Sequence, residues 1–156
     1  MKKLSLILLF LLTNISFASK NPSESYRIKV NAESRSNYEL SGNDLNGLVN
    51  GTDPELTFLV GSKIDFLVDA PGHPFYLKIK AGIGKKDQIE NIENNGDTTG
   101  IISWVPKKPG KYYYQCGKHK NMVGEINIVG KWFLIHVYDL KRNYVDFYPN
   151  FKLEII

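Results

Sequence analysis

Short β-type runs separated by turn residues recur along residues 26–129, and this pattern leaves few folds open. The runs are rich in aromatic and β-branched residues, and Gly, Pro, Asn or Ser bounds most of them. We expect strands at 26–32, 55–61, 63–70, 73–80, 100–105, 111–116 and 124–129. Several short strands at this spacing, with almost no helical periodicity between them, are typical of an all-β sandwich or barrel.

Two segments between these runs are expected to lack strands. Residues 46–54 contain two Asn-Gly pairs and a proline, which predicts a loop. Residues 84–97 are mostly polar, and Asp87 precedes Glu90 by three positions. That spacing is typical of a helix cap, so we expect a short surface helix there.

The first residues have the parts of a secretory signal peptide. Lys2 and Lys3 precede the apolar run LSLILLFLL, and small residues at Ser16 and Ala18 match the positions that a signal peptidase reads. We predict cleavage after Ala18 and a periplasmic or secreted mature protein. A membrane anchor is disfavoured, because a spanning helix needs roughly 20 apolar residues and this run is much shorter.

The predicted chain therefore has a signal peptide at 1–18, one β domain at 19–130 and a C-terminal extension at 131–156. The extension contains WFLIHVYDL and several later aromatic residues, which favour further short strands but indicate no role. Removing 1–18 takes away two lysines and no acid, so the formal net charge falls from +4 to +2. So mild a charge does not indicate a nucleic-acid partner.

Cys116 is the only cysteine in the chain, so no internal disulfide can form. A lone thiol in an oxidising compartment is prone to oxidation unless something occupies it. His119 and Met122 follow at three-residue intervals, in a loop that begins at Gly117 and ends at Gly124. We expect this loop to turn tightly enough to bring both side chains beside the cysteine.

A second imidazole is expected from His73, which has the parity of the apolar face of its predicted strand. One thiolate, two imidazoles and a weak thioether are the ligand set of a blue copper electron-transfer site. The remaining histidine, His136, lies in the extension, and we expect a structural or surface role for it.

These residues resemble the cupredoxins, the blue copper proteins such as plastocyanin, azurin and amicyanin. The resemblance covers residues 26–129 and is strongest in YYYQCGKHKNMVGEINI, whose C-x2-H-x2-M spacing is similar to the short ligand loop of amicyanin. It implies a cupredoxin-like Greek-key β-sandwich with one type 1 copper ion. His73, Cys116 and His119 would be the strong equatorial ligands of that ion, and Met122 the axial ligand.

Two positions depart from the family pattern. Pro74 stands where many members have an asparagine whose backbone N–H bonds the cysteine sulfur, and proline has no N–H. Lys118 stands where plastocyanin and amicyanin have a proline, so its N–H is available. We therefore expect the sulfur of Cys116 to keep one such bond, from the other side.

The function that the resemblance implies is single-electron transfer between redox partner proteins, without catalysis. Lys118 and Lys120 flank His119, the expected exit for the electron, and Lys111 is expected nearby. These lysines are either a solvated charge cluster without a role or, as a functional hypothesis, a basic collar that attracts an acidic redox partner. We also expect a monomer that has no membrane span once the signal peptide is removed.

Other chemistries fit these residues less well. A thiol enzyme needs a third orienting group, which is not visible. A thioether is a poor zinc ligand, and a copper enzyme of the nitrite reductase kind needs a second centre with additional histidines. A copper carrier or storage protein stays open as the alternative, although such proteins usually expose clusters of methionine and histidine.

Overall fold

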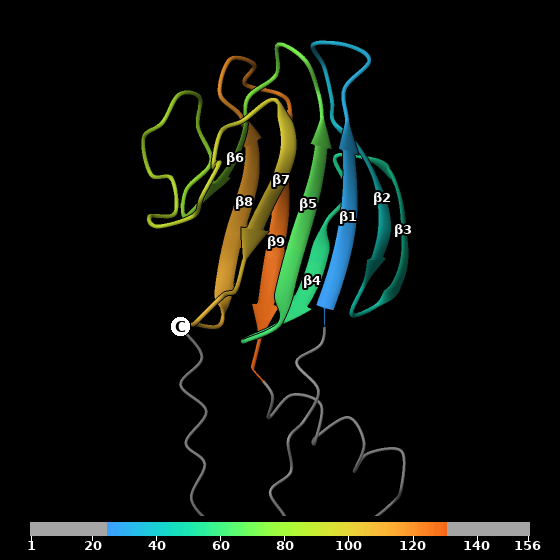
Figure 1. The fold of residues 1–156 in the computed structure, drawn as a ribbon, viewed down its shortest axis with the longest axis vertical. Helices are drawn as coiled ribbons and strands as arrows, with labels where there is room; N and C mark the ends of the chain where they lie inside the picture. The colour runs from blue at the N-terminus through green and yellow to red at the C-terminus, as the bar shows by residue number, and fades with distance from the viewer. Residues whose placement is uncertain (1–24, 131–156) are drawn as a thin grey trace, which may run out of the picture.

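The computed structural model describes residues 25–130, which form nine strands and no helix (Figure 1). The strands are β1 (Ser25–Asn31), β2 (Glu39–Asp44), β3 (Gly47–Thr52), β4 (Leu56–Leu59), β5 (Lys63–Asp69), β6 (Phe75–Lys78), β7 (Thr99–Trp104), β8 (Gly110–Cys116) and β9 (Val123–Val129). They form a five-stranded sheet in the order β3-β2-β1-β5-β7 and a four-stranded sheet in the order β4-β9-β8-β6. The predicted all-β sandwich is confirmed.

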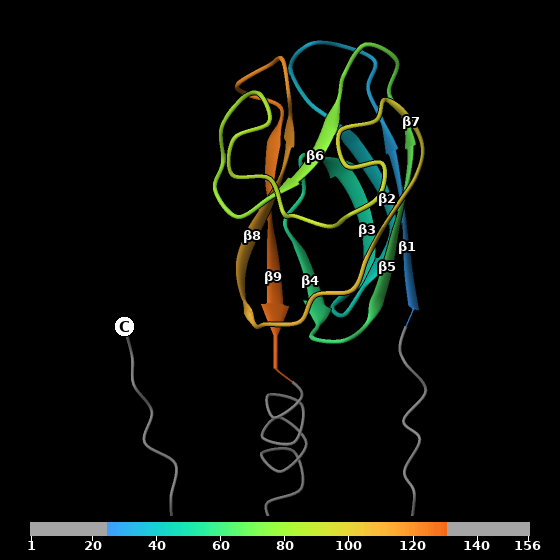
Figure 2. The same cartoon turned by 60° about the vertical axis from the view of Figure 1, so that its left-hand side comes forward.

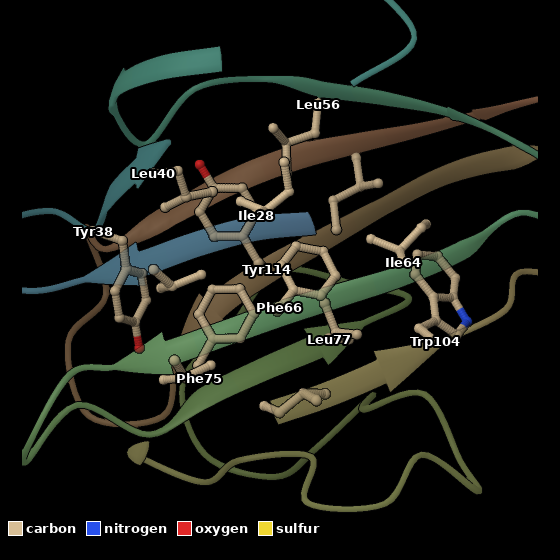
Figure 3. Packing of buried hydrophobic residues seen from close by; sticks show 14 of the residues in the cluster. Ile28, Tyr38, Leu40, Leu56, Ile64, Phe66, Phe75, Leu77, Trp104 and Tyr114 are labelled. Carbon is tan, nitrogen blue, oxygen red and sulfur yellow. The ribbon is translucent and has the colours of Figure 1, made fainter. Parts of the chain in front are cut away.

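The two sheets bury their inner faces against one shared core. Alternate residues of several strands are buried, as Ile126 and Ile128 are on β9. At one end of this core Phe75 stacks on Tyr114 with ring centroids 5.6 Å apart and meets Tyr38 edge-on at 5.1 Å (Figure 3). Burying one such ring contributes about 1.5–3 kcal/mol to stability. A rigid aromatic layer therefore lies at this end of the sandwich.

Three loops meet at that same end, which we call the site pole. β1 and β5 are parallel and both run toward it, so the loops 32–38 and 70–74 lie there. β8 also ends there, and the loop 117–122 returns the chain to antiparallel β9. These loops gather at the top of Figure 1, whereas the described part of the chain begins and ends at the opposite pole.

The seven predicted strands are confirmed, each to within two residues at either end. The prediction of a loop at 46–54 is wrong, because β3 lies there and pairs with β2, a strand that was not predicted. Leu40 is the apolar residue that β2 buries, and Val49 is the one that β3 buries. One inward apolar residue per strand is too weak a pattern to reveal either strand.

The predicted helix at 84–97 is also wrong, because this segment consists of turns. Three of its residues have left-handed backbone angles that no α-helix contains, namely Asp87 (φ 58°), Asn91 (φ 58°) and Asn94 (φ 61°). Ile89 and Ile92 pack against the core, which a solvated surface helix would not require. The segment lies beside the edge strand β6, to which it is joined by a bridge between Lys78 and Gln88 (Figure 2).

This covering segment changes which side chains of β6 are buried. Strict alternation predicted that Ile79 points inward and that Tyr76 and Lys78 point outward, yet Ile79 is 53% exposed. Tyr76 is 7% exposed and Lys78 is fully buried, because the segment lies over the outer face of the strand. The Lys78 ammonium donates to the backbone carbonyls of Gly82 and Gly84. Burial lowers the pKa of Lys78.

Several expectations fall outside the described residues and stay predictions. They concern the signal peptide at 1–18 and the extension at 131–156, which includes His136. Within residues 25–130, no helix exists that is long and apolar enough to cross a membrane.

Candidate copper centre

Cys116 is the last residue of β8 and points inward from the site pole. It is fully buried, like Tyr114 two positions earlier on the same face of the strand. Its N–H donates to the carbonyl of Met122 at 2.9 Å, and this bond closes the loop that also carries His119. The six-residue interval from Cys116 to Met122 is thus folded into one tight loop, as the two glycines predicted.

His73 lies in the loop between β5 and β6. The prediction that it begins a strand is wrong by two residues, because β6 starts at Phe75. Its N–H donates to the carbonyl of Ala70 at 2.9 Å in a turn that contains Gly72 at a φ of 81°. The two loops of the site are joined directly, because the Gly117 N–H donates to the carbonyl of Pro74 at 2.8 Å. The turn still directs the His73 ring toward the cysteine.

The structure brings all four predicted site residues together. The ligand atoms of His73, Cys116 and His119 lie within 4.8 Å of one another. The Cys116 Sγ lies 3.5 Å from His119 Nδ1, and the Met122 Sδ lies 3.2 Å from His73 Nδ1. Two ligands of one ion, each at about 2.0–2.3 Å, lie roughly 3.3–3.8 Å apart. The Cys116–His119 distance matches this range, and the cluster has the chemistry to hold one transition-metal ion.

The sulfur of Cys116 accepts one backbone hydrogen bond, from the Lys118 N–H at 3.5 Å. This is the bond expected from the lysine that replaces the family's proline. Pro74 offers no N–H from the other loop. Hydrogen bonds to a ligating sulfur tune a metal site, so this departure is chemically significant.

The electrostatic surroundings favour the neutral form of His73. Burial first, and then the positive charges of His119, Lys118 and Arg35, lower its pKa. A neutral imidazole is the form that ligates a metal. The lowered pKa of His73 therefore favours the form of the ring that can bind a metal.

Tyr38 is part of the site, although nothing in the sequence analysis singled it out. It is fully buried, and its hydroxyl donates to the carbonyls of His73 at 3.0 Å and Pro74 at 3.1 Å. Burial first, and then the charge and hydrogen-bonding proximity of Cys116, raise its pKa far above the usual range. Its parity with Leu40 would have placed it inward, had β2 been recognised.

Gln115 is a second residue that the sequence analysis missed. It precedes Cys116 and points away from the core, yet it is only 1% exposed. Its amide nitrogen donates to three carbonyls of the ligand loop, those of His119 (3.0 Å), Lys120 (3.3 Å) and Met122 (3.0 Å). Its oxygen accepts the Gly82 N–H at 3.2 Å. One buried amide thus holds the ligand loop from outside.

The charges around the site differ from the predicted collar in one residue. Lys111 lies near the start of β8, five residues or about 16 Å along the strand from Cys116. It pairs instead with Glu125 of β9 at 2.6 Å. Arg35, in the loop 32–38, joins the site pole in its place, because its charge acts on His73.

Comparisons with known proteins place the fold. No protein-family model and no curated protein matches the chain. Among solved structures, a copper protein rusticyanin is similar at 17% identity and a TM-score of 0.50, covering 68% of this chain and 78% of its own. Reduced rusticyanin is similar at 18% identity and a TM-score of 0.50, covering 68% and 80%. The chain has the cupredoxin fold that the sequence predicted, whereas the plastocyanin or amicyanin subtype stays a prediction.

Proposed function

We propose that this cupredoxin-fold protein is an exported type 1 copper protein that transfers single electrons between redox partners. The observation that carries the proposal is the cluster of one thiol sulfur and two imidazole nitrogens within 4.8 Å, with a thioether sulfur beside it. This is the donor set of blue copper electron-transfer sites. Bound copper would supply the one-electron change between Cu(II) and Cu(I).

The donor set favours copper over other metals of similar size. Thiolate and thioether sulfurs are soft ligands that suit Cu(I), and imidazole suits Cu(II) as well. Zinc sites are usually completed by Cys or His. Within residues 25–130 no further His, Cys, Asp or Glu joins this cluster, and the thioether of Met122 lies beside it. One site can therefore accept both oxidation states of copper.

The surrounding chain would keep the ligands still while the charge of the ion changes. Cys116 and Met122 are fully buried, and a backbone hydrogen bond of 2.9 Å joins them. The Gly117 N–H ties the ligand loop to the loop of His73 at Pro74. Ligands that are already in place need little rearrangement, and preorganised polar groups add no reorganisation cost at the moment of reaction.

A role as a metal ligand would explain why an exported protein keeps the single thiol of Cys116. A signal peptide at 1–18 would direct the chain to an oxidising compartment, where an unprotected thiol is at risk. Burial of Cys116 at the site pole and its use as a ligand would both protect it. The proposal therefore accounts for a single cysteine in an exported protein.

Exposed Lys118 and Lys120 flank the half-buried His119, through which the electron would leave. We call the exposed residues Arg35, Lys118 and Lys120 the basic rim. Positive charge around an exit attracts negatively charged partners and raises the rate of encounter at low salt. An acidic redox partner is therefore part of the proposal.

We expect the Lys118→Glu/Lys120→Glu double variant to react roughly tenfold more slowly with an anionic oxidant at low ionic strength. The reduced protein is mixed with hexacyanoferrate(III), and loss of the reduced form is followed by stopped flow. A cationic cobalt(III) complex should show the opposite change. Both differences should shrink at 0.15 M salt, where the screening length is about 8 Å.

The matched control is Lys107→Glu/Lys108→Glu, which makes the same charge change on exposed residues at the opposite pole. It should leave both rates nearly unchanged. Equal effects of the two double variants would show that only net charge matters. In that case the basic rim would have no steering role.

A chelator experiment separates electron transfer from copper delivery. The Cu(II)-loaded protein is mixed with excess EDTA, and the reduced protein with a Cu(I)-specific chelator. An electron-transfer site held by buried ligands should show an intense blue colour and should release copper slowly in both states. Rapid, complete release without that colour would favour a carrier and would contradict the proposal.

A further inference from the structure

Lys78 is a fully buried lysine whose ammonium binds backbone carbonyls. It lies on the outer face of β6 and donates to the carbonyls of Gly82 and Gly84. Within residues 25–130 no ion pair joins it to a carboxylate. Taking an ammonium out of water costs free energy, even where hydrogen bonds offset part of that cost. An apolar side chain of similar length would avoid the cost, so a specific role for the ammonium would explain the lysine.

The two glycines that accept from this ammonium also bind the residues on either side of the ligand cysteine. The Gly82 N–H donates to the side-chain oxygen of Gln115 at 3.2 Å, and the Gly84 N–H donates to the carbonyl of Gly117 at 2.8 Å. Gln115 precedes the cysteine, and Gly117 follows it. We call residues 82–84 the glycine clip. Its N–H groups bind the backbone and side chain next to the site, and its carbonyls bind the buried ammonium.

Hydrogen bonds hold the glycine clip in place, because little else does. The clip lies outside every strand, and its middle residue, Ile83, is 56% exposed, so burial of an apolar side chain does not fix it. Gly84 has a φ of 74°, which only glycine adopts at no steric cost. An ammonium has three donors and no acceptor, so one lysine can bind both carbonyls at once. Without it, the clip would lose two of the four hydrogen bonds described here.

We propose that Lys78 is a positioning residue of the copper site, which holds the glycine clip and, through it, the chain on both sides of Cys116. This inference rests on the proposed function. Lys78 contacts no ligand itself, so its effect on the site passes through the clip. Groups that orient a metal ligand from outside typically change metal affinity or activity by about 10–100-fold when they are removed.

The first test measures how firmly Cys116 is held in the metal-free protein. Lys78→Met removes the ammonium and keeps an unbranched side chain, so the fold should survive, and circular dichroism checks this. Cys116 is the only cysteine, so alkylation by iodoacetamide, followed by mass spectrometry, reports on this side chain alone. The thiol is fully buried, so its reaction requires the structure to open locally. We expect alkylation to be about tenfold faster in Lys78→Met than in the wild type.

Two control variants separate this effect from charge and from overall stability. Lys80→Met makes the same substitution at an exposed lysine two residues further along. Ile64→Ala removes a fully buried side chain near the start of β5, at the opposite pole, and lowers stability without touching the clip. Iodoacetamide is uncharged, so neither lysine attracts or repels it. Both controls should be alkylated at nearly the wild-type rate without denaturant.

Bound copper gives a second readout. Lys78→Met should release Cu(II) to EDTA about tenfold faster than Lys80→Met does. Its thiolate-to-copper absorption band should also shift, whereas the band of Ile64→Ala should not, because lower overall stability leaves the ligands in place. Equal alkylation rates in Lys78→Met and Lys80→Met would overturn the inference.

A measurement on the wild type keeps the inference testable if Lys78→Met does not fold. The amides of Gly82 and Gly84 should then exchange with solvent as slowly as amides within the strands, and rapid exchange would contradict a clip that is held in place. A wild type that binds no blue copper would defeat the proposed function. The alkylation rates would still decide whether Lys78 holds Cys116.

Discussion

Cys116→Ser is expected to abolish the blue colour of the Cu(II) protein completely. The intense visible absorption of a blue copper site depends on a thiolate bound to Cu(II), and a serine hydroxyl is a harder and far weaker ligand. The substitution is nearly isosteric at a fully buried position, so the fold should survive it. The measurement is the visible spectrum of wild type and variant with one equivalent of Cu(II), together with circular dichroism to confirm folding.

Met122→Leu is the matched control, because it also removes a buried sulfur from the site. The thiolate and both imidazoles remain in this variant, so the blue colour should persist. A folded Cys116→Ser protein that stays blue would contradict the assignment of the cysteine. Loss of colour in both variants would contradict the proposal that Cys116 is a strong equatorial ligand and Met122 only a weak axial one.

Gln115→Leu should lower the free energy of unfolding by about 3 kcal/mol. The change removes the hydrogen bonds of Gln115 to the Gly82 N–H and to three carbonyls of the ligand loop, of which only that of Met122 keeps a second donor, the Cys116 N–H. Each buried polar group that loses its hydrogen bond costs about 1–3 kcal/mol, and groups that reach water recover part of it. A looser loop should also release copper to a chelator faster than the wild type does.

Asn121→Leu makes the same change from amide to apolar side chain within the same loop, at an exposed position. Substitutions of this kind usually alter stability by less than about 0.5 kcal/mol. Urea unfolding of the metal-free proteins gives the free energies, and chelator competition gives the release rates. If the two variants matched in both quantities, Gln115 would not be holding the ligand loop.

The candidate site could be predicted largely from the sequence, because its signals are local. Cys116, His119 and Met122 lie within one loop whose glycines mark its ends, and a strand of alternating residues directs the sulfur inward. Parity predicted that His73 faces inward, and its ring joins the cluster although the residue lies in a turn before β6.

The parts that were missed depend on contacts between distant segments. Gln115 and Lys78 lie on outer faces of their strands. The turns of 79–97 cover both side chains, and the ligand loop also covers Gln115. The polar sequence of that segment resembles a surface helix, but three of its residues have left-handed backbone angles that the sequence does not reveal. Tyr38 directly precedes β2, and Leu40 is the only buried apolar residue of that strand, so the sequence shows no apolar alternation there.

The central claim is that one bound copper ion changes oxidation state reversibly in a site that folding has already formed. Its most direct test is a potentiometric titration of the protein loaded with one equivalent of copper, followed by visible absorption. We predict a blue colour that disappears and returns with a one-electron Nernst slope, and the same curve in both directions. A colourless Cu(II) protein, or a colour that is lost on reduction and does not return, would contradict the account.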